Sequence, residues 1–170
     1  TYFEEQNNKL NAIQELLNRP QDTVNSVQQL QIENTQLKKE VAELNKLKTQ
    51  IVKKELEAEL KEKEGLQFLA KEVSLDAQGI KNAAFDMGQN KDNLVLILAA
   101  VSNNKPILSC YISKKLVKDR GLNAGEIVRS LGKHIRGGGG GQAFFATAGG
   151  SYPEGINAAL GAAEFEVFSN

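Results

Sequence analysis

Two hydrophobic patterns divide the chain near residue 65. Before this point apolar residues recur at steps of three and four, which is typical of a helix face, and the segment holds one proline and no glycine. After it, short apolar runs alternate with amphipathic segments and glycine-containing turns. The patterns predict an α+β chain, with a helical coiled-coil subdomain over residues 1–65 and a compact mixed-sheet domain over residues 66–170.

A short helix, a turn and a long helix are expected in the first part, arranged as a hairpin. The turn is "NRPQDT", where Asp22 or Thr23 can cap the second helix, and Gly65 is the expected end of that helix. The apolar seam of the second helix alternates steps of three and four, as a heptad repeat does: Val27, Leu30, Asn34, Leu37, Val41, Leu44, Lys48 and Ile51.

A helix of this length cannot bury its seam by itself. The first helix can cover only the early third, so the remainder is expected to pack on a second chain, on the globular domain or on another part of a longer protein. Asn34 either sets the register of such a pairing or lies solvated on an imperfect seam. The start at Thr1 rather than at a methionine also favours a fragment of a longer polypeptide.

The second part alternates strand-like and helix-like segments. The predicted strands are 66–73, 93–101, 107–113 and 143–148, and "SNNKP" is expected to join the middle two as a hairpin. The predicted helices are 75–89, 114–121, 123–135 and 152–168. This order of elements indicates a mixed sheet with helices packed against it.

The stretch "HIRGGGGGQAFFATAGG", residues 134–150, contains five consecutive glycines. Glycine loses more backbone freedom on folding than any other residue, so some interaction must offset that cost. A linker is not expected, because only about 29 residues follow the run and the run is therefore predicted to lie inside one domain. Two roles remain open: the glycines permit close backbone packing, or they adopt left-handed conformations that turn successive N–H groups toward an anion.

The charge distribution indicates phosphate as that anion. The whole chain is neutral, with 21 basic and 21 acidic side chains, but residues 105–141 carry eight basic and two acidic ones. Lys133 and Arg136 lie in the last turn before the glycines, where cations and backbone amides together suit phosphate. Phe144 and Phe145 could offer a stacking face, although strand alternation predicts that at least one is in the core.

The cysteine, the histidine and the apolar stretches of the sequence predict neither a metal site nor a membrane-spanning helix. Cys110 and His134 are the only residues of their types and make no metal-ligand set, and no stretch is apolar enough to cross a bilayer. Cys110 is expected to be a small buried side chain. A single cysteine fits a reducing, cytoplasmic setting.

"AGEIVRSLGKHIRGGGGGQAFFATAGG" closely resembles the end of alanyl-tRNA synthetases, where a glycine-rich run precedes a small-residue stretch and a further Gly-Gly pair. From about Leu66 to Phe168 the order of elements is similar to the DHH-associated domain, which these enzymes share with DHH phosphoesterases. "AIQELLN" and "LKKEVAELNK" resemble the helical subdomain that precedes it. The resemblance implies a C-terminal, non-catalytic segment that grips the outer corner of tRNA.

Two departures from the family pattern affect the expected chemistry. Gln142 and "AFFAT" stand where the synthetases usually have an arginine and "PDMAQ", so the resemblance carries no charged phosphate contact over to this position. The phosphoesterase branch commonly has a histidine after its glycines, whereas Gln142 and Ala143 follow here and no Asp-His-His core precedes them. Phosphoester hydrolysis is therefore not expected.

For the parent enzyme, the resemblance implies attachment of alanine to tRNA(Ala) and editing of mischarged tRNA, with ATP, magnesium and zinc used upstream and no cofactor in this segment. The implied partners are tRNA(Ala), the upstream catalytic and editing domains and a second copy in a homodimer. The alternative is a coiled-coil oligomerisation module with only minor RNA contact. The expected RNA-binding residues are Lys114, Lys115, Lys118, Arg129, Lys133, Arg136, Gly137, Gly138, Gly139, Gly140, Gly141 and Gln142.

Overall fold

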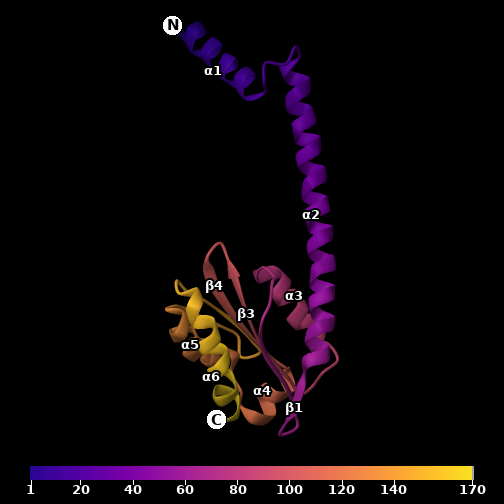
Figure 1. Cartoon of the computed structure of the whole chain (residues 1–170), viewed down its shortest axis with the longest axis vertical. Coiled ribbons are helices and arrows are strands. Elements are labelled where there is room, and N and C mark those ends of the chain that lie inside the picture. The colour runs from indigo at the N-terminus through magenta and orange to yellow at the C-terminus, as the bar shows by residue number, and fades with distance from the viewer. Residues whose placement is uncertain (170) are drawn as a thin grey trace. The chain divides into compact units, whose positions relative to one another are not determined.

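The computed structural model of the chain describes residues 1–169. It divides into a helical unit, Thr1–Leu44, and a globular unit that begins at Asn45. The helical unit contains α1 (Tyr2–Leu16) and the first part of α2 (Thr23–Glu59), which Figure 1 shows as one continuous helix. The last part of α2 belongs to the globular unit.

The turn between α1 and α2 follows the prediction. Asn18 and Arg19 adopt left-handed conformations, with φ of 59° and 51°, and the Asp22 carboxylate accepts a hydrogen bond from the Asn25 N–H at 3.0 Å. However, α1 has no buried residue, and Leu30 on the seam is 51% exposed. The expectation that α1 covers the early part of the seam is therefore wrong.

The expected helix end at Gly65 is also wrong, since α2 ends at Glu59. The next residues form a short strand, β1 (Lys61–Lys63), which pairs antiparallel with β2 (Leu66–Glu72). Glu64 and Gly65 make the turn between these strands with φ of 52° and 77°. Gly65 therefore lies in a turn between two strands rather than at the end of a helix, and its left-handed conformation suits glycine.

The other predicted elements are present. They are α3 (Ala77–Gly88), β3 (Leu94–Ser102), β4 (Lys105–Ile112), α4 (Lys114–Arg120), α5 (Ala124–Gly132), a 3-10 turn (Lys133–Ile135), β6 (Phe145–Gly149) and α6 (Ile156–Phe168), with a further 3-10 turn (Pro153–Gly155) before α6. The predicted hairpin of β3 and β4 is confirmed. A strand that was not predicted, β5 (Gly138–Gly141), completes the sheet.

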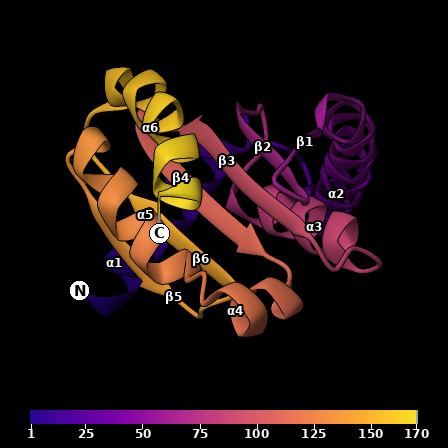
Figure 2. The same ribbon diagram turned by 90° about the horizontal axis from the view of Figure 1, so that it is seen from below.

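The six strands have the order β1-β2-β3-β4-β6-β5, with β2 and β3 parallel and every other pair antiparallel. Helices α5 and α6 cover one face, over a core that includes Ile97, Leu108 and Leu131. On the opposite face α3 and the end of α2 pack over β2, β3 and β4, with Leu56 and Leu96 fully buried. Figure 2 shows the sheet between these two groups of helices. The mixed α+β fold is thus confirmed.

Candidate nucleic-acid interface

The glycine run forms a strand rather than an anion-binding turn. Gly138–Gly141 pair with β6 in the register Gly138↔Gly149 and Gly140↔Thr147. Within Gly137–Gly141 only Gly141 has a positive φ, at 155°. Of the two roles left open by the sequence, the series of left-handed glycines is therefore wrong, because the run is held extended by its partner strand.

The strand nevertheless leaves backbone groups available. β5 is the last strand in the sheet order, so it pairs on one side only. In an antiparallel ladder alternate N–H groups point to the other side, and on an edge strand they have no ladder partner. Backbone donors without bulky side chains thus line the edge of the sheet.

The glycines of the run fall into two sets with different surroundings. A methyl group on Gly137 would lie 2.0 Å from the Gly149 carbonyl oxygen, and one on Gly139 would lie 2.2 Å from the Thr147 carbonyl oxygen. A methyl group on Gly138 or Gly140 would meet nothing within 4 Å. The packing role therefore holds for alternate glycines, while the others lie on an open surface.

The first set is packed against the backbone of β6, and α5 packs closely on the same hairpin. The Gly137 N–H donates to the Gly132 carbonyl oxygen at 2.9 Å, at the end of α5. A Cβ added at Gly125 would lie 3.5 Å from the Gly141 carbonyl oxygen, and one at Gly132 would lie 3.3 Å from the Ala148 Cβ. Small residues on both elements let the helix approach the strand backbone closely.

The second set defines an open glycine face, made of Gly138, Gly140, Gly149, Thr147 and Ile107. Residues directly opposite each other in an antiparallel pair share a face of the sheet, and the register places these five together. Thr147 and Gly149 are exposed, Ile107 is half-buried, and a Cβ at Gly149 would also meet open space. This part of the sheet therefore presents bare backbone to solvent.

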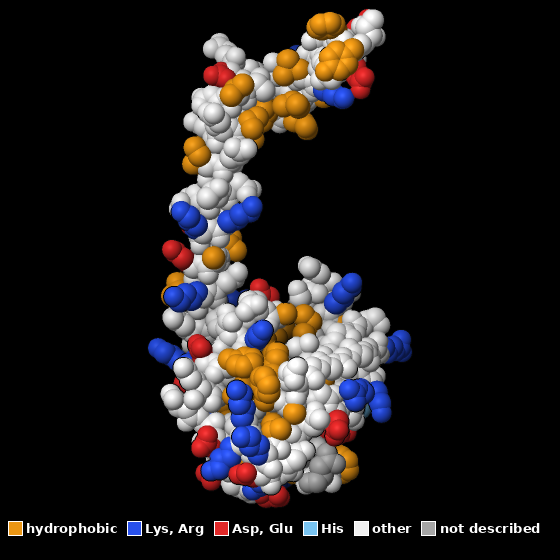
Figure 3. All heavy atoms as spheres, turned by 180° about the vertical axis from the view of Figure 1, so that it is seen from behind, with side chains coloured by type: hydrophobic (Ala, Val, Ile, Leu, Met, Phe, Trp, Pro, Cys, Tyr) orange, Lys and Arg blue, Asp and Glu red, His pale blue; other side chains and the backbone are white. Residues whose placement is uncertain are grey.

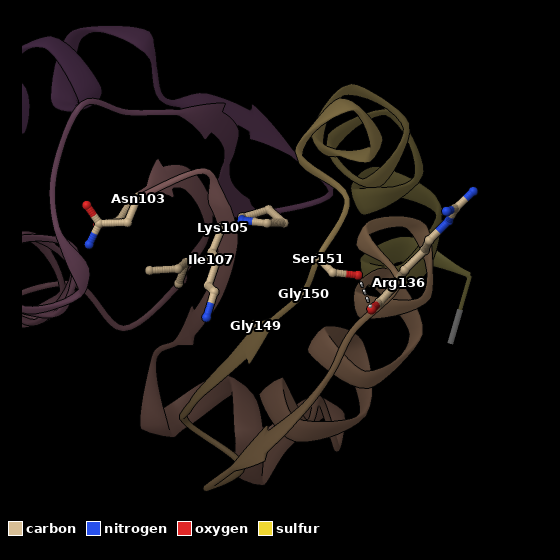
Figure 4. Close-up of a pocket in the computed structure, with 9 residues that line it drawn as sticks. Asn103, Lys105, Ile107, Arg136, Gly149, Gly150 and Ser151 are labelled. Carbon is tan, nitrogen blue, oxygen red and sulfur yellow. Dashed lines mark hydrogen bonds between the residues drawn. The ribbon is translucent and has the colours of Figure 1, made fainter.

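A shallow hollow of about 570 Å³ lies at one end of the open glycine face. It is bordered by the turn of the β3–β4 hairpin and by Gly149–Ser151, and Figure 4 shows Lys105 extending over it toward Gly149. The Gly150 N–H donates to the Pro106 carbonyl oxygen at 3.0 Å, which holds the two segments together. Lys105 belongs to the basic segment 105–141, but it is not one of the RNA-binding residues expected from the sequence.

Arg136 borders the same hollow through its backbone. Its carbonyl oxygen accepts a hydrogen bond from the Ser151 hydroxyl at 3.5 Å, and its φ of 49° is left-handed. Its guanidinium points away from the hollow (Figure 4) and lies 4.5 Å from the centre of the Tyr152 ring. The Arg136 side chain is thus held at the rim, next to the first glycine of the run.

The other expected contacts lie on several elements. Gly137–Gly141 and Gln142 share the β5–β6 hairpin, where the Gln142 N–H donates to the Phe145 carbonyl oxygen at 2.9 Å. Lys115 and Lys118 are exposed on α4, whereas Arg129 and Lys133 are exposed on α5 and the turn that follows it. Helix α5 packs on the face opposite the open glycine face, and Leu116 of α4 belongs to the same core, so these four cations are carried by elements of that opposite side.

Lys114 and Phe144 lie near the turn of the β5–β6 hairpin, at the end away from Lys105. The Lys114 ammonium lies 5.3 Å from the centre of the Phe144 ring. The α4 helix that carries it starts at the buried Ser113, whose hydroxyl accepts from the Leu94 N–H at 3.0 Å and donates to the Lys91 carbonyl oxygen at 2.5 Å. Phe144 and Phe145 are both half-buried, and Phe145 packs against the core beneath α3, in line with the prediction that at least one of them contributes to the core.

Cys110 is fully buried, as predicted, and burial raises the pKa of its thiol well above the usual range. Over residues 1–169 no three His, Cys, Asp or Glu side chains gather in a way that could hold a metal ion. None of the helices within the same residues combines the length and the apolar character that crossing a membrane requires.

The mixed sheet and its glycine hairpin lie in the part of the chain that a known family model matches. The model of the DHHA1 domain family matches residues 65–167, and the chain belongs to this family. It is similar to the alanine–tRNA ligases of Christiangramia forsetii, at 51% identity over 96% of this chain, and of Flavobacterium psychrophilum, at 41% over 94%. The chain spans 19% and 18% of those two proteins.

The fold is also similar to a solved structure, the C-Ala domain of the alanyl-tRNA synthetase from Aquifex aeolicus. The two share 26% sequence identity with a TM-score of 0.52, over 60% of this chain and 89% of that one. The resemblance to alanyl-tRNA synthetases inferred from the glycine-rich stretch is therefore confirmed.

Proposed function

We propose that this chain is the C-terminal, non-catalytic segment of an alanine–tRNA ligase and that its globular unit binds the outer corner of tRNA(Ala). The observation that carries the proposal is the open glycine face, with Lys105 at one end and Lys114 at the other. The names of the relatives support the identity of the parent enzyme.

Binding to the corner of a folded RNA depends on shape more than on base sequence. A surface without side chains lets phosphates, riboses or the face of a base pair approach the peptide backbone. The edge amides of β5 can donate to phosphate oxygens, and the exposed cations around the hairpin supply the sequence-independent part of the affinity. Binding of this kind uses backbone donors and cations, so the proposed role requires no catalytic side chain in this segment.

In the same proposal the parent enzyme attaches alanine to tRNA(Ala) and edits mischarged tRNA in the cytoplasm. Its ATP, magnesium and zinc are used in the upstream catalytic and editing domains. The role of this segment is then to hold the tRNA for those domains.

The test is a titration of a tRNA(Ala) transcript against the chain at several salt concentrations, with Lys105→Glu/Lys114→Glu, the cations at the two ends of the open glycine face, compared with the parent sequence. We expect the double variant to bind at least about tenfold more weakly, with a salt dependence of log K that is lower by about two ions, because two phosphate contacts are lost. Lys38→Glu/Lys39→Glu, two exposed lysines of α2, is the matched control. Equal losses in both double variants would contradict the assigned face.

A second candidate function is dimerisation through the helical unit. Leu37, Val41 and Leu44 follow heptad spacing on α2 and are 59%, 55% and 64% exposed. Burying such a seam against a second copy would form a coiled coil. We expect sedimentation equilibrium to give a dimer for the chain and a monomer for Leu37→Lys/Val41→Lys; a parent chain that stays monomeric at high micromolar concentration would exclude this function.

A further inference from the structure

Four aromatic rings from three elements meet beside the open glycine face. Phe85 of α3 lies at the centre, with its ring 5.4 Å from that of Tyr111 on β4, 5.2 Å from that of Phe145 and 6.3 Å from that of Phe144, measured between ring centres. The planes of the Phe85 and Phe144 rings stand at 85° to each other. These residues, called here the aromatic cluster, are far apart in sequence and come together only through the fold.

The rings of the aromatic cluster are only partly buried in the hydrophobic core. Tyr111 is 8% exposed, and burial raises the pKa of its hydroxyl. Phe85 is 36% exposed, while Phe144 and Phe145 are half-buried. Rings needed only for stability would be expected to lie deeper, so part of this aromatic surface is free to contact a ligand.

The cluster continues the open glycine face. Phe145 stands opposite Tyr111 in the sheet, and Thr147, two residues further along β6, lies on the same side. Figure 3 shows hydrophobic side chains gathered on this side of the globular unit, bordered by lysine and arginine side chains. An RNA lying on the glycine face would therefore bring its neighbouring nucleotides over the rings.

The charges around the cluster favour an anionic partner. Lys114 lies over the Phe144 ring, and Lys115 and Lys118 are exposed on the same helix, α4. Asp86, which follows Phe85 in the sequence, lies 3.9 Å from the Lys53 ammonium, so its charge is paired with a cation. A flat apolar surface beside several cations suits a nucleotide, whose base stacks and whose phosphate is negative.

We propose that Phe85, Phe144 and Phe145 form a stacking site for one unpaired nucleobase of the bound RNA, with Lys114 contacting the adjacent phosphate. The inference rests on the proposed function, because it places one nucleotide of the same RNA. It adds a contact whose energy comes from stacking, in contrast to the phosphate contact proposed for Lys105.

Fluorescence provides the test, since the chain contains no tryptophan. Phe144→Trp keeps a stacking ring and places the only tryptophan of the chain in the aromatic cluster, where it can be excited separately from the tyrosines. We expect a tRNA(Ala) transcript to quench this emission at the same concentrations at which it binds. The matched control is Phe165→Trp, at a 71%-exposed position on α6, where binding is expected to leave the emission unchanged.

Affinity gives a second, independent measurement. We expect Phe144→Leu to weaken tRNA binding by about tenfold without changing the slope of log K against log salt, because stacking releases no counterions. Binding with neither quenching nor loss of affinity would overturn the stacking site and leave the proposed function standing. Failure of the parent chain to bind the transcript at all would overturn the proposed function itself.

Discussion

Replacing Gly139 by alanine is expected to lower the free energy of unfolding of the globular unit by about 3 kcal/mol or more, at the upper end of what overpacking costs. The added methyl group would lie 2.2 Å from the Thr147 carbonyl oxygen and 2.6 Å from the Ala148 Cβ. The first contact is with backbone in the paired strand, so no side-chain rotation can relieve it. Urea denaturation followed by circular dichroism measures the change.

Gly138→Ala is the matched control, one residue away in the same strand. A methyl group there meets nothing within 4 Å, and the φ of Gly138 is not in the left-handed region. Alanine restricts the unfolded chain more than glycine does, so we expect no loss and a gain of up to about 1 kcal/mol. Equal stabilities for the two variants would contradict the division of the glycines into a packed and an open set.

The difference between neighbouring glycines shows where prediction from the sequence stops. The apolar runs of β2, β3 and β4 and the amphipathic face of α5 predict their own elements, because the period of the side chains reports the geometry directly. A run of glycine has no such period. β5 is extended because β6 pairs with it and α5 packs on it, and both interactions are tertiary.

The same limit applies to β1, whose residues Lys61–Lys63 continue the charged pattern of the preceding helix. They form a strand because the left-handed turn at Glu64 and Gly65 returns the chain along β2. Local composition favours helix there, and pairing with a neighbour overrides it.

The sequence predicts which charged residues lie near the candidate site. It does not predict which side chains the fold brings together there. A count of lysine and arginine finds the basic segment, and the glycine run marks the hairpin at its end. Phe85 carries no such signal, because on α3 it is one more apolar residue of an amphipathic helix. Its place beside Phe145 follows from how α3 packs on the sheet, which no local pattern encodes.

Replacing Gly140 by glutamate is expected to weaken binding of tRNA(Ala) by at least about tenfold while the globular unit stays folded. A side chain at this position starts in open space, so it does not disturb the packing under α5. It would place a bulky carboxylate in the middle of the open glycine face, where proximity to phosphate is repulsive and costs several kcal/mol in a close contact. Equilibrium titration at fixed salt, with circular dichroism to verify folding, measures the effect.

Gly161→Glu separates this local effect from the change in net charge. Gly161 is an exposed glycine of α6, a Cβ there meets nothing within 4 Å, and α6 covers the face of the sheet opposite the open glycine face. Both variants carry the same added charge, so a long-range repulsion would weaken both equally. If only Gly140→Glu loses affinity, then the bare backbone of β5 and β6 lies against the RNA. Equal affinities would place the RNA elsewhere on the unit, even if binding remained sensitive to salt.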